Sequence, residues 1–187
     1  MSYKNPNVKS SYRENDLGRS LYDAVMLHKP KKIVEFGSLE GYSAIAMAMA
    51  LKDIGEGCVY ANDLWEMYPY THSTKDVCLK NIKNHGVEGF IKLGSADFFK
   101  WLKDPGDFDM LHIDISNDAS IMLQVREALH EKIQNGAVVI FEGGTVERDN
   151  VGWMLEYKKM PMHENIENIG YKILDSRFPS MSIMKKL

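Results

Sequence analysis

The sequence predicts an α/β fold with a doubly wound, mostly parallel seven-stranded sheet, helices on both faces and a C-terminal antiparallel hairpin. Strand-like apolar runs alternate with helical segments from residue 32 to residue 142, and this alternation is typical of parallel sheets covered by helices. The run 137–142, AVVIFE, is apolar up to its terminal acid, as in a strand buried on both faces. Two later strands, 169–175 and 181–185, are joined by a link too short for a parallel crossover, so an antiparallel hairpin is expected.

The bulk properties indicate one ordinary globular domain. The chain has 187 residues, 44% of them hydrophobic and 26% charged, values typical of a single domain over residues 1–187. The net charge of -3 argues against a general nucleic-acid binder, which would carry a basic excess. We expect the polar residues 1–12 to form a flexible tail.

Compartment and partners are predicted from what the sequence lacks. The N-terminus shows no apolar signal region, and the longest unbroken apolar run, 44–51, is too short to span a membrane. Cys58 and Cys78 form no metal-binding spacing and are expected to be free thiols. We therefore expect a cytoplasmic protein with no membrane or nucleic-acid partner, and a homodimer stays open.

The elements of the first half follow from local patterns. Apolar residues at helical spacing predict a helix over 14–28, with Asn15 or Asp16 as its cap and Pro30 after its end. A β-branched run predicts the strand 32–36, and an Ala- and Met-rich run predicts a helix that ends near Gly55. Further strands and helices are expected at 57–63, 74–85 and 89–93.

The second half repeats the alternation. A brief helix is expected over 95–102 with Ser95 as its cap. Residues 107–114 read as a strand, and apolar residues at every fourth position predict a helix over 121–133, before the strand 137–142. The segment 151–160 is a further helical candidate.

The turn between the first strand and its helix, Gly37-Ser-Leu-Glu-Gly41, is the first candidate binding site. Such a turn places free N–H groups of a helix N-terminus beside an anionic or polar ligand. The dinucleotide pattern G-x-G-x-x-G is absent, since Leu39 and Glu40 stand inside the turn. Glu40 would also repel a pyrophosphate. A ligand with a carboxylate and an ammonium, and without phosphate, fits this turn better than NAD or FAD.

Acidic residues stand at the ends of four predicted strands: Glu35, Asp63, Asp114 and Glu142. The carboxyl ends of strands in a doubly wound sheet meet at one edge, where ligands bind. We expect these acids to gather in one crevice. The loop at Gly143-Gly144 and the segments 65–72 and 153–163, which carry aromatic residues, are expected to shape an acceptor pocket beside it.

The run VEFGSLEGYSAI resembles the first motif of the catechol-O-methyltransferase-like branch of class I S-adenosylmethionine-dependent methyltransferases. Glu35, Gly37, Gly41, Tyr42 and Ser43 match that motif. The resemblance implies a Rossmann-like fold and S-adenosylmethionine as cofactor. The cofactor-binding residues that it implies are Glu35, Gly37, Ser38, Gly41, Tyr42, Ser43, Asp63, Leu64, Ala96, Asp97 and Asp114.

The same resemblance bears on a metal ion. The run FDMLHID resembles the family's fourth motif, in which the acid, here Asp114, lies beside the reacting methyl and binds the divalent ion in metal-dependent members. Glu142 takes the place of the second metal acid. Two positions depart from the pattern: Gly143 stands at the third ligand position, and Asn117 stands where the family carries a Lys or His base. Mg²⁺ or another divalent cation, held by Asp114 and Glu142 if at all, therefore stays open.

The expected catalytic residues are Asp114, Glu142 and His72. His72 has a suitable intrinsic pKa for proton transfer near neutrality, whereas His112 stands inside a buried strand and is expected to be a core residue. The predicted activity is O-methylation of a small molecule or a sugar hydroxyl. Two alternatives stay open: a methyltransferase directed at nitrogen or a macromolecule, and a cofactor-binding module that has lost catalysis.

Overall fold

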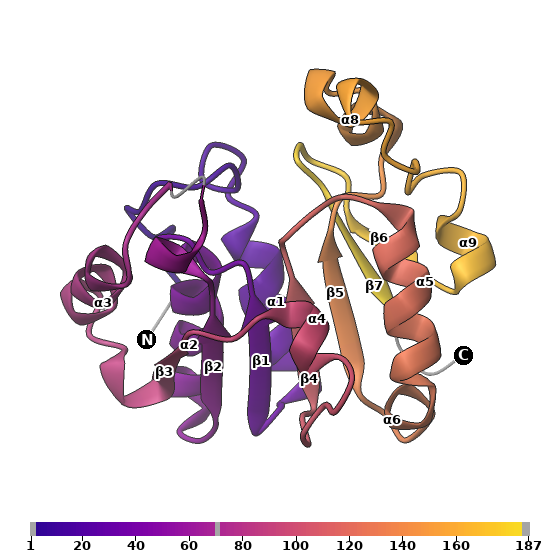
Figure 1. The fold of residues 1–187 in the computed structure, drawn as a ribbon. Helices are drawn as coiled ribbons and strands as arrows, with labels where there is room; N and C mark the ends of the chain where they lie inside the picture. Colours follow the sequence, from indigo (N-terminus) through magenta and orange to yellow (C-terminus); the bar gives the residue numbers. More distant parts are fainter. Residues whose placement is uncertain (1–2, 70–71, 185–187) are drawn as a thin grey trace. The chain divides into compact units, whose positions relative to one another are not determined.

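The structure, a computed structural model, describes residues 3–69 and 72–184. The chain divides into two compact units, Met1–Phe108 and Asp109–Leu187, which are described separately below (Figure 1). Residue 185 of the last predicted strand, residues 1–2 of the predicted tail and residues 70–71 of the aromatic segment 65–72 lie outside the described residues. The single domain over residues 1–187 stays a prediction.

The first unit is built on three parallel strands. Their order is β3-β2-β1, with Val34 of β1 opposite Tyr60 of β2, and Tyr60 opposite Lys92 of β3. The helix that follows β1 packs against the helix that precedes it, and Figure 1 shows both behind the strands. These elements are α1 (Gly18–His28), β1 (Lys32–Phe36), α2 (Tyr42–Ile54), β2 (Cys58–Asn62) and β3 (Ile91–Gly94).

Short helices complete this unit: η1 (Trp65–Met67), α3 (Lys75–Asn84), η2 (Glu88–Phe90) and α4 (Phe98–Trp101). The Thr74 hydroxyl caps α3 by accepting a hydrogen bond from the Val77 amide, which agrees with the predicted start. The predicted cap of α4 is wrong. Asp97 rather than Ser95 caps this helix, because its carboxylate accepts from the Lys100 amide at 2.8 Å.

The N-terminal segment corrects the predicted flexible tail. Val8 and Tyr12 are buried, with 2% and 0% exposure. Asn5 accepts a hydrogen bond from the Tyr42 hydroxyl at 2.7 Å. The segment is anchored because its few apolar side chains join the core of the first unit, a long-range effect that local polarity does not reveal.

The start of α1 is also corrected. Its N-cap is Leu17, which offers no side-chain cap. Asp16, one of the two predicted caps, has a left-handed φ of 52° and accepts from the Tyr3 hydroxyl instead. The predicted helix 14–28 therefore begins at Gly18.

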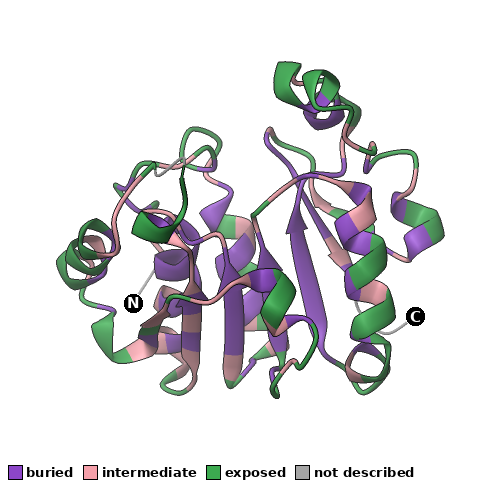
Figure 2. Ribbon diagram, in the orientation of Figure 1, coloured by how far each residue is buried: buried purple, intermediate pink, exposed green. Residues whose placement is uncertain are grey.

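The second unit holds four strands in the order β4-β5-β7-β6. The first pair is parallel and the other two pairs are antiparallel, so the predicted C-terminal hairpin is confirmed. Every residue of the first two strands is buried, and Figure 2 shows β5 buried along its length. The strands are β4 (Met110–Ile113), β5 (Val138–Glu142), β6 (Lys172–Asp175) and β7 (Met181–Met184).

Helices of the second unit match the predictions in part. The predicted helix 121–133 is two helices that break at Leu129, and the carboxylate of Asp118 caps the first of them. The candidate 151–160 contains one short helix. The helices are α5 (Ala119–Ala128), α6 (His130–Gln134), α7 (Val146–Asp149), α8 (Gly152–Glu156) and α9 (Ile166–Ile169). The sequence patterns did not predict α7 and α9, each of which is only four residues long.

Candidate active site

The glycine turn of the first unit needs both of its glycines. Gly37 and Gly41 each have a φ of 93°, in the region that favours glycine. The Gly37 amide donates to the Asn62 carbonyl at 3.0 Å, and the Gly41 amide donates to the Ser38 carbonyl at 2.7 Å. A Cβ at position 41 would lie 3.0 Å from the Cys78 sulfur. The turn is thus closed on itself and packed against α3.

Glu35 and Ser38 hold each other. Glu35 is completely buried, and its Oε2 accepts a hydrogen bond from the Ser38 hydroxyl at 2.6 Å. A buried carboxylate needs such donors, because burial without them is costly. The pair ties the end of β1 to the turn.

Asp63 organises two loops at once. Its Oδ2 accepts from the Leu39 amide at 2.7 Å, and its Oδ1 accepts from the Leu64 and Trp65 amides at 2.7 and 3.2 Å. The Trp65 indole N–H donates to the Leu39 carbonyl at 2.9 Å. The carboxylate therefore joins the end of β2 to the glycine turn, and its role toward a ribose stays a prediction.

The N-terminus of α2 carries no side-chain cap. Its N-cap residue is Gly41, and the first-turn residues Tyr42, Ser43 and Ala44 are buried. The first N–H groups of a helix have no partner inside the helix, so an uncapped and buried end is a site for an anion. Tyr42 does not fill it, because its hydroxyl donates to Asn5 and accepts from the Gly18 amide at 3.3 Å.

The surroundings of the turn are negative. The pKa of the Cys78 thiol is raised to about 12, mainly by burial and in addition by the carboxylates of Glu35, Asp63 and Glu40. A thiol whose pKa is raised by three nearby carboxylates lies in a region that disfavours a further negative charge. The turn therefore suits a ligand that carries a cation beside its carboxylate.

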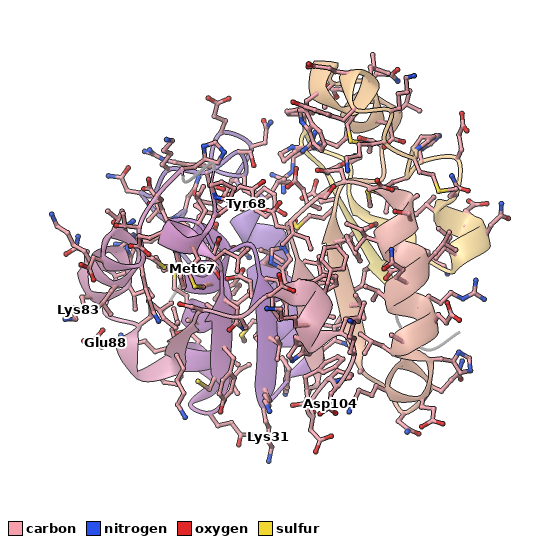
Figure 3. All side chains as sticks on the ribbon, in the orientation of Figure 1. Lys31, Met67, Tyr68, Lys83, Glu88 and Asp104 are labelled. Carbon is pink, nitrogen blue, oxygen red and sulfur yellow. The ribbon has the colours of Figure 1, made fainter. Side chains whose placement is uncertain are left out.

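The remaining predicted residues of the first unit are near the surface. Leu64 and Ala96 are half-buried, and Asp97 is the cap of α4 described above. His72 is exposed, and it follows η1 and the exposed Met67 and Tyr68 labelled in Figure 3. The catalytic role of His72 stays a prediction.

In the second unit, Asp114 directly follows β4 and Glu142 is the last residue of the neighbouring strand β5, where Ile113 pairs with Phe141. Asp114 is half-buried and Glu142 is buried. His112 is completely buried within β4, as expected of a core residue.

Arg148 on α7 is a site residue that the sequence reading missed. Its Nε donates to Oε1 of Glu142 at 2.8 Å, and its Nη2 lies 2.8 Å from the same oxygen. Nη2 also donates to Oδ1 of Asn117 at 2.7 Å, while the Asn117 side-chain amide donates to the Glu142 carbonyl at 3.2 Å. The three side chains form one buried cluster. No sequence motif predicts this cluster, because α7 is short and follows the loop that begins at Gly143.

Asp149, the next residue, fixes α7 from the other side. Its carboxylate is buried and accepts from the Met162 amide at 3.0 Å and the His163 amide at 2.7 Å. The loop after α8 is thereby tied to α7. Arg148 is thus held by its own partners and by the anchoring of its helix.

The residues present do not fit the divalent cation that the family resemblance leaves open. Glu142 is already neutralised by Arg148. At Gly143 a Cβ would lie 2.8 Å from Nδ2 of Asn117 and 2.9 Å from Sδ of Met162, so no third ligand can project there. Across residues 3–69 and 72–184, no cluster of three or more His, Cys, Asp or Glu is arranged to hold a metal.

Comparisons with known proteins add to this geometry. The profile of a family described as "Methyltransferase domain" matches residues 34–142. A caffeoyl-CoA O-methyltransferase from Stellaria longipes is 30% identical over 129 residues, which cover 63% of this chain and 49% of that protein. The chain thus spans about half the length of this curated relative.

Two solved structures share the fold. The O-methyltransferase TomG from Streptomyces achromogenes matches with a TM-score of 0.62 and 18% identity, over 95% of this chain and 90% of that one. An O-methyltransferase from Bacillus cereus matches with a TM-score of 0.64 and 16% identity, over 96% of this chain and 85% of that one. These likenesses confirm the predicted fold class.

No helix among the described residues is both long enough and apolar enough to cross a membrane.

The matching profile covers more than half of the chain and includes the glycine turn, Asp63, Asp114 and Glu142. It confirms the resemblance drawn from the first motif. The chain belongs to the methyltransferase-domain family.

Proposed function

We propose that this chain is an S-adenosylmethionine-dependent O-methyltransferase that acts on a small-molecule hydroxyl. The observation that carries the proposal is the buried, uncapped N-terminus of α2 behind a glycine turn held by Glu35 and Asp63. TomG was solved in complex with S-adenosylmethionine, and the Bacillus cereus O-methyltransferase with its demethylated product S-adenosylhomocysteine. Both proteins support this reading of the turn.

The residues of the first unit fit the parts of this cofactor. The free N–H groups at the start of α2 and the Ser43 hydroxyl suit the amino-acid carboxylate. The negative surroundings of the turn suit the ammonium. Asp63 retains an acceptor position on Oδ2 for a ribose hydroxyl, because a carboxylate oxygen accepts two hydrogen bonds and Oδ2 accepts one. Leu64 and Ala96 are the proposed adenine neighbours, with Asp97 at the adenine edge.

The bound cofactor would supply an electrophilic methyl group. The protein then has two tasks: to orient the acceptor and to take its hydroxyl proton. Glu142 is the proposed proton acceptor, since Asn117 occupies the position of the family's base and its amide takes up no proton at neutral pH. Asp114 is the proposed neighbour of the reacting methyl, and His72 stays the alternative base.

The test combines cofactor binding with turnover. Purified protein is titrated with S-adenosylhomocysteine in a calorimeter, and methyl transfer from labelled S-adenosylmethionine is measured with phenolic and sugar acceptors. Asp63→Ala should weaken binding about 10- to 100-fold, the equivalent of a lost charge-assisted hydrogen bond. Asp114→Asn should weaken it less.

Asp104→Asn is the matched control, because Asp104 is an exposed acid of the same unit, labelled in Figure 3. It should leave affinity unchanged. Equal losses in the Asp63 and Asp104 variants, or no heat with the folded wild-type protein, would contradict the proposal.

A further inference from the structure

The guanidinium of Arg148 is enclosed on three sides. Glu142 and Asn117 accept from its Nε and Nη2. The rings of Trp153 and Phe178 lie near its central carbon, with centroids 5.2 and 5.9 Å away, at distances typical of cation–π contacts. This cation cannot swing away to solvent without breaking all of these contacts.

Nη1 of Arg148 and Oε2 of Glu142 make no hydrogen bond with the described residues. A guanidinium carries five N–H donors, two of them on Nη1. Within the part of the chain that the structure describes, no residue accepts from Nη1 of Arg148 or donates to Oε2 of Glu142. Neither atom is among the fully buried unpartnered atoms of the described residues, and the two side chains keep 10% and 7% exposure. Both atoms therefore keep some contact with solvent.

The open atoms define the ligand by its hydrogen bonding. Nη1 offers donors and Oε2 offers an acceptor. A hydroxyl is both an acceptor and a donor, so it satisfies the two atoms together. A carboxylate or phosphate would satisfy Nη1 but would be repelled by Glu142, whose charge already cancels that of Arg148. The pair therefore favours a neutral hydroxyl over an anion.

We infer that Arg148 and Glu142 together bind the acceptor hydroxyl, with Arg148 as a built-in cation in the place of a divalent ion. The inference rests on the proposed function and names the acceptor side of it. As the oxygen–methyl bond forms, the sulfur–methyl bond breaks and its electron pair stays on sulfur. The hydroxyl proton passes to Oε2 of Glu142. Arg148 stabilises the negative charge that develops on the oxygen, as fixed donors do in other group transfers.

The test uses full-length protein, catechol and methyl glucoside as acceptor probes, and EDTA throughout. Wild-type protein should methylate at least one probe at the same rate with EDTA as with Mg²⁺. Arg148→Ala should lower kcat about 100-fold, as does the loss of an oxyanion donor, while its affinity for S-adenosylhomocysteine stays that of wild type. Millimolar guanidinium chloride should restore part of the lost rate. Glu142→Gln should also lose turnover, and guanidinium should not restore it.

Arg126→Ala is the matched control, because Arg126 of the same unit donates to the backbone carbonyl of Asn168 in an exposed contact at 3.0 Å. It should change neither rate nor binding. If Arg148→Ala does not fold, Arg148→Lys tests the same point. This variant keeps the positive charge but loses the planar set of guanidinium donors, so it should bind S-adenosylhomocysteine normally and show a reduced kcat.

Three results would overturn the inference: wild-type turnover that EDTA abolishes and Mg²⁺ restores, full kcat in either Arg148 variant, or normal S-adenosylhomocysteine binding with no turnover of either probe. If the wild-type protein gives no heat on titration with S-adenosylhomocysteine, the proposed function itself is contradicted.

Discussion

Acids at the strand ends of the two units are satisfied in different ways. In the first unit, Glu35 accepts a hydrogen bond from the Ser38 hydroxyl, and Asp63 accepts from the backbone amides of Leu39 and Leu64; these donors are neutral. In the second unit, Glu142 is bound to the guanidinium of Arg148, which cancels its charge. Because their donors differ, we propose different ligands for these acids: a cation-bearing ligand in the first unit and a neutral hydroxyl in the second.

The largest expected effect breaks the neutral pair of the second unit. Arg148→Ala leaves the buried Glu142 carboxylate without its cation, and the free energy of unfolding should fall by about 3–5 kcal/mol. Arg126→Ala should cost at most about 1 kcal/mol, because its hydrogen bond to the Asn168 carbonyl is exposed. Urea denaturation of both variants measures the difference. Similar losses would show that the buried ion pair stabilises the protein no more than an exposed hydrogen bond does.

A smaller effect tests the glycine turn of the first unit. Gly41 and Gly55 have nearly the same φ, 93° and 92°, but a Cβ at 41 would meet the Cys78 sulfur at 3.0 Å, whereas a Cβ at 55 meets nothing within 4 Å. Both alanine variants should lose about 1–2 kcal/mol from backbone strain. Gly41→Ala should lose about 1–3 kcal/mol more from crowding. Equal melting temperatures of the two variants would contradict the packing of the turn against α3.

The smallest effect probes the negative surroundings of that turn. The folded pKa of Cys78 is raised to about 12, above the ordinary value of 9.0. Between these values the unfolded chain loses a proton that the folded chain keeps, so stability should fall as pH rises from 9 toward 12. In native protein at pH 8, a disulfide reagent should modify the half-buried Cys58 before the buried Cys78. Faster modification of Cys78 would count against a negative, desolvated site.

The parts of the structure that local sequence predicts are those set by neighbouring residues. The strand, turn and helix from Lys32 to Ile54 follow from a β-branched run, two glycines and an Ala-rich stretch. The start of the helix near Thr74 and the C-terminal hairpin are equally local. Each depends on residues within one or two turns of chain, where propensity and periodicity act.

The features that escaped prediction depend on distant partners. Tyr12 and Asn5 are held by the core and by Tyr42, far along the chain. Arg148 meets Asn117, 31 residues away, and meets Glu142 only because the chain turns at Gly143 and Gly144. A single arginine in a four-residue helix has no periodicity to reveal its role. The nearest sequence clue is indirect: Asn117 and Gly143 depart from the family pattern together.

The most direct test of the account is a pair of calorimetric titrations of the wild-type protein with S-adenosylmethionine and with NAD. We expect saturable binding of S-adenosylmethionine, because we propose that its carboxylate binds at the uncapped N-terminus of α2 and its cations lie near the acids around the turn. We expect no heat with NAD, because those acids would repel its pyrophosphate. Binding of NAD, or no binding of S-adenosylmethionine by the folded protein, would contradict the proposed cofactor site.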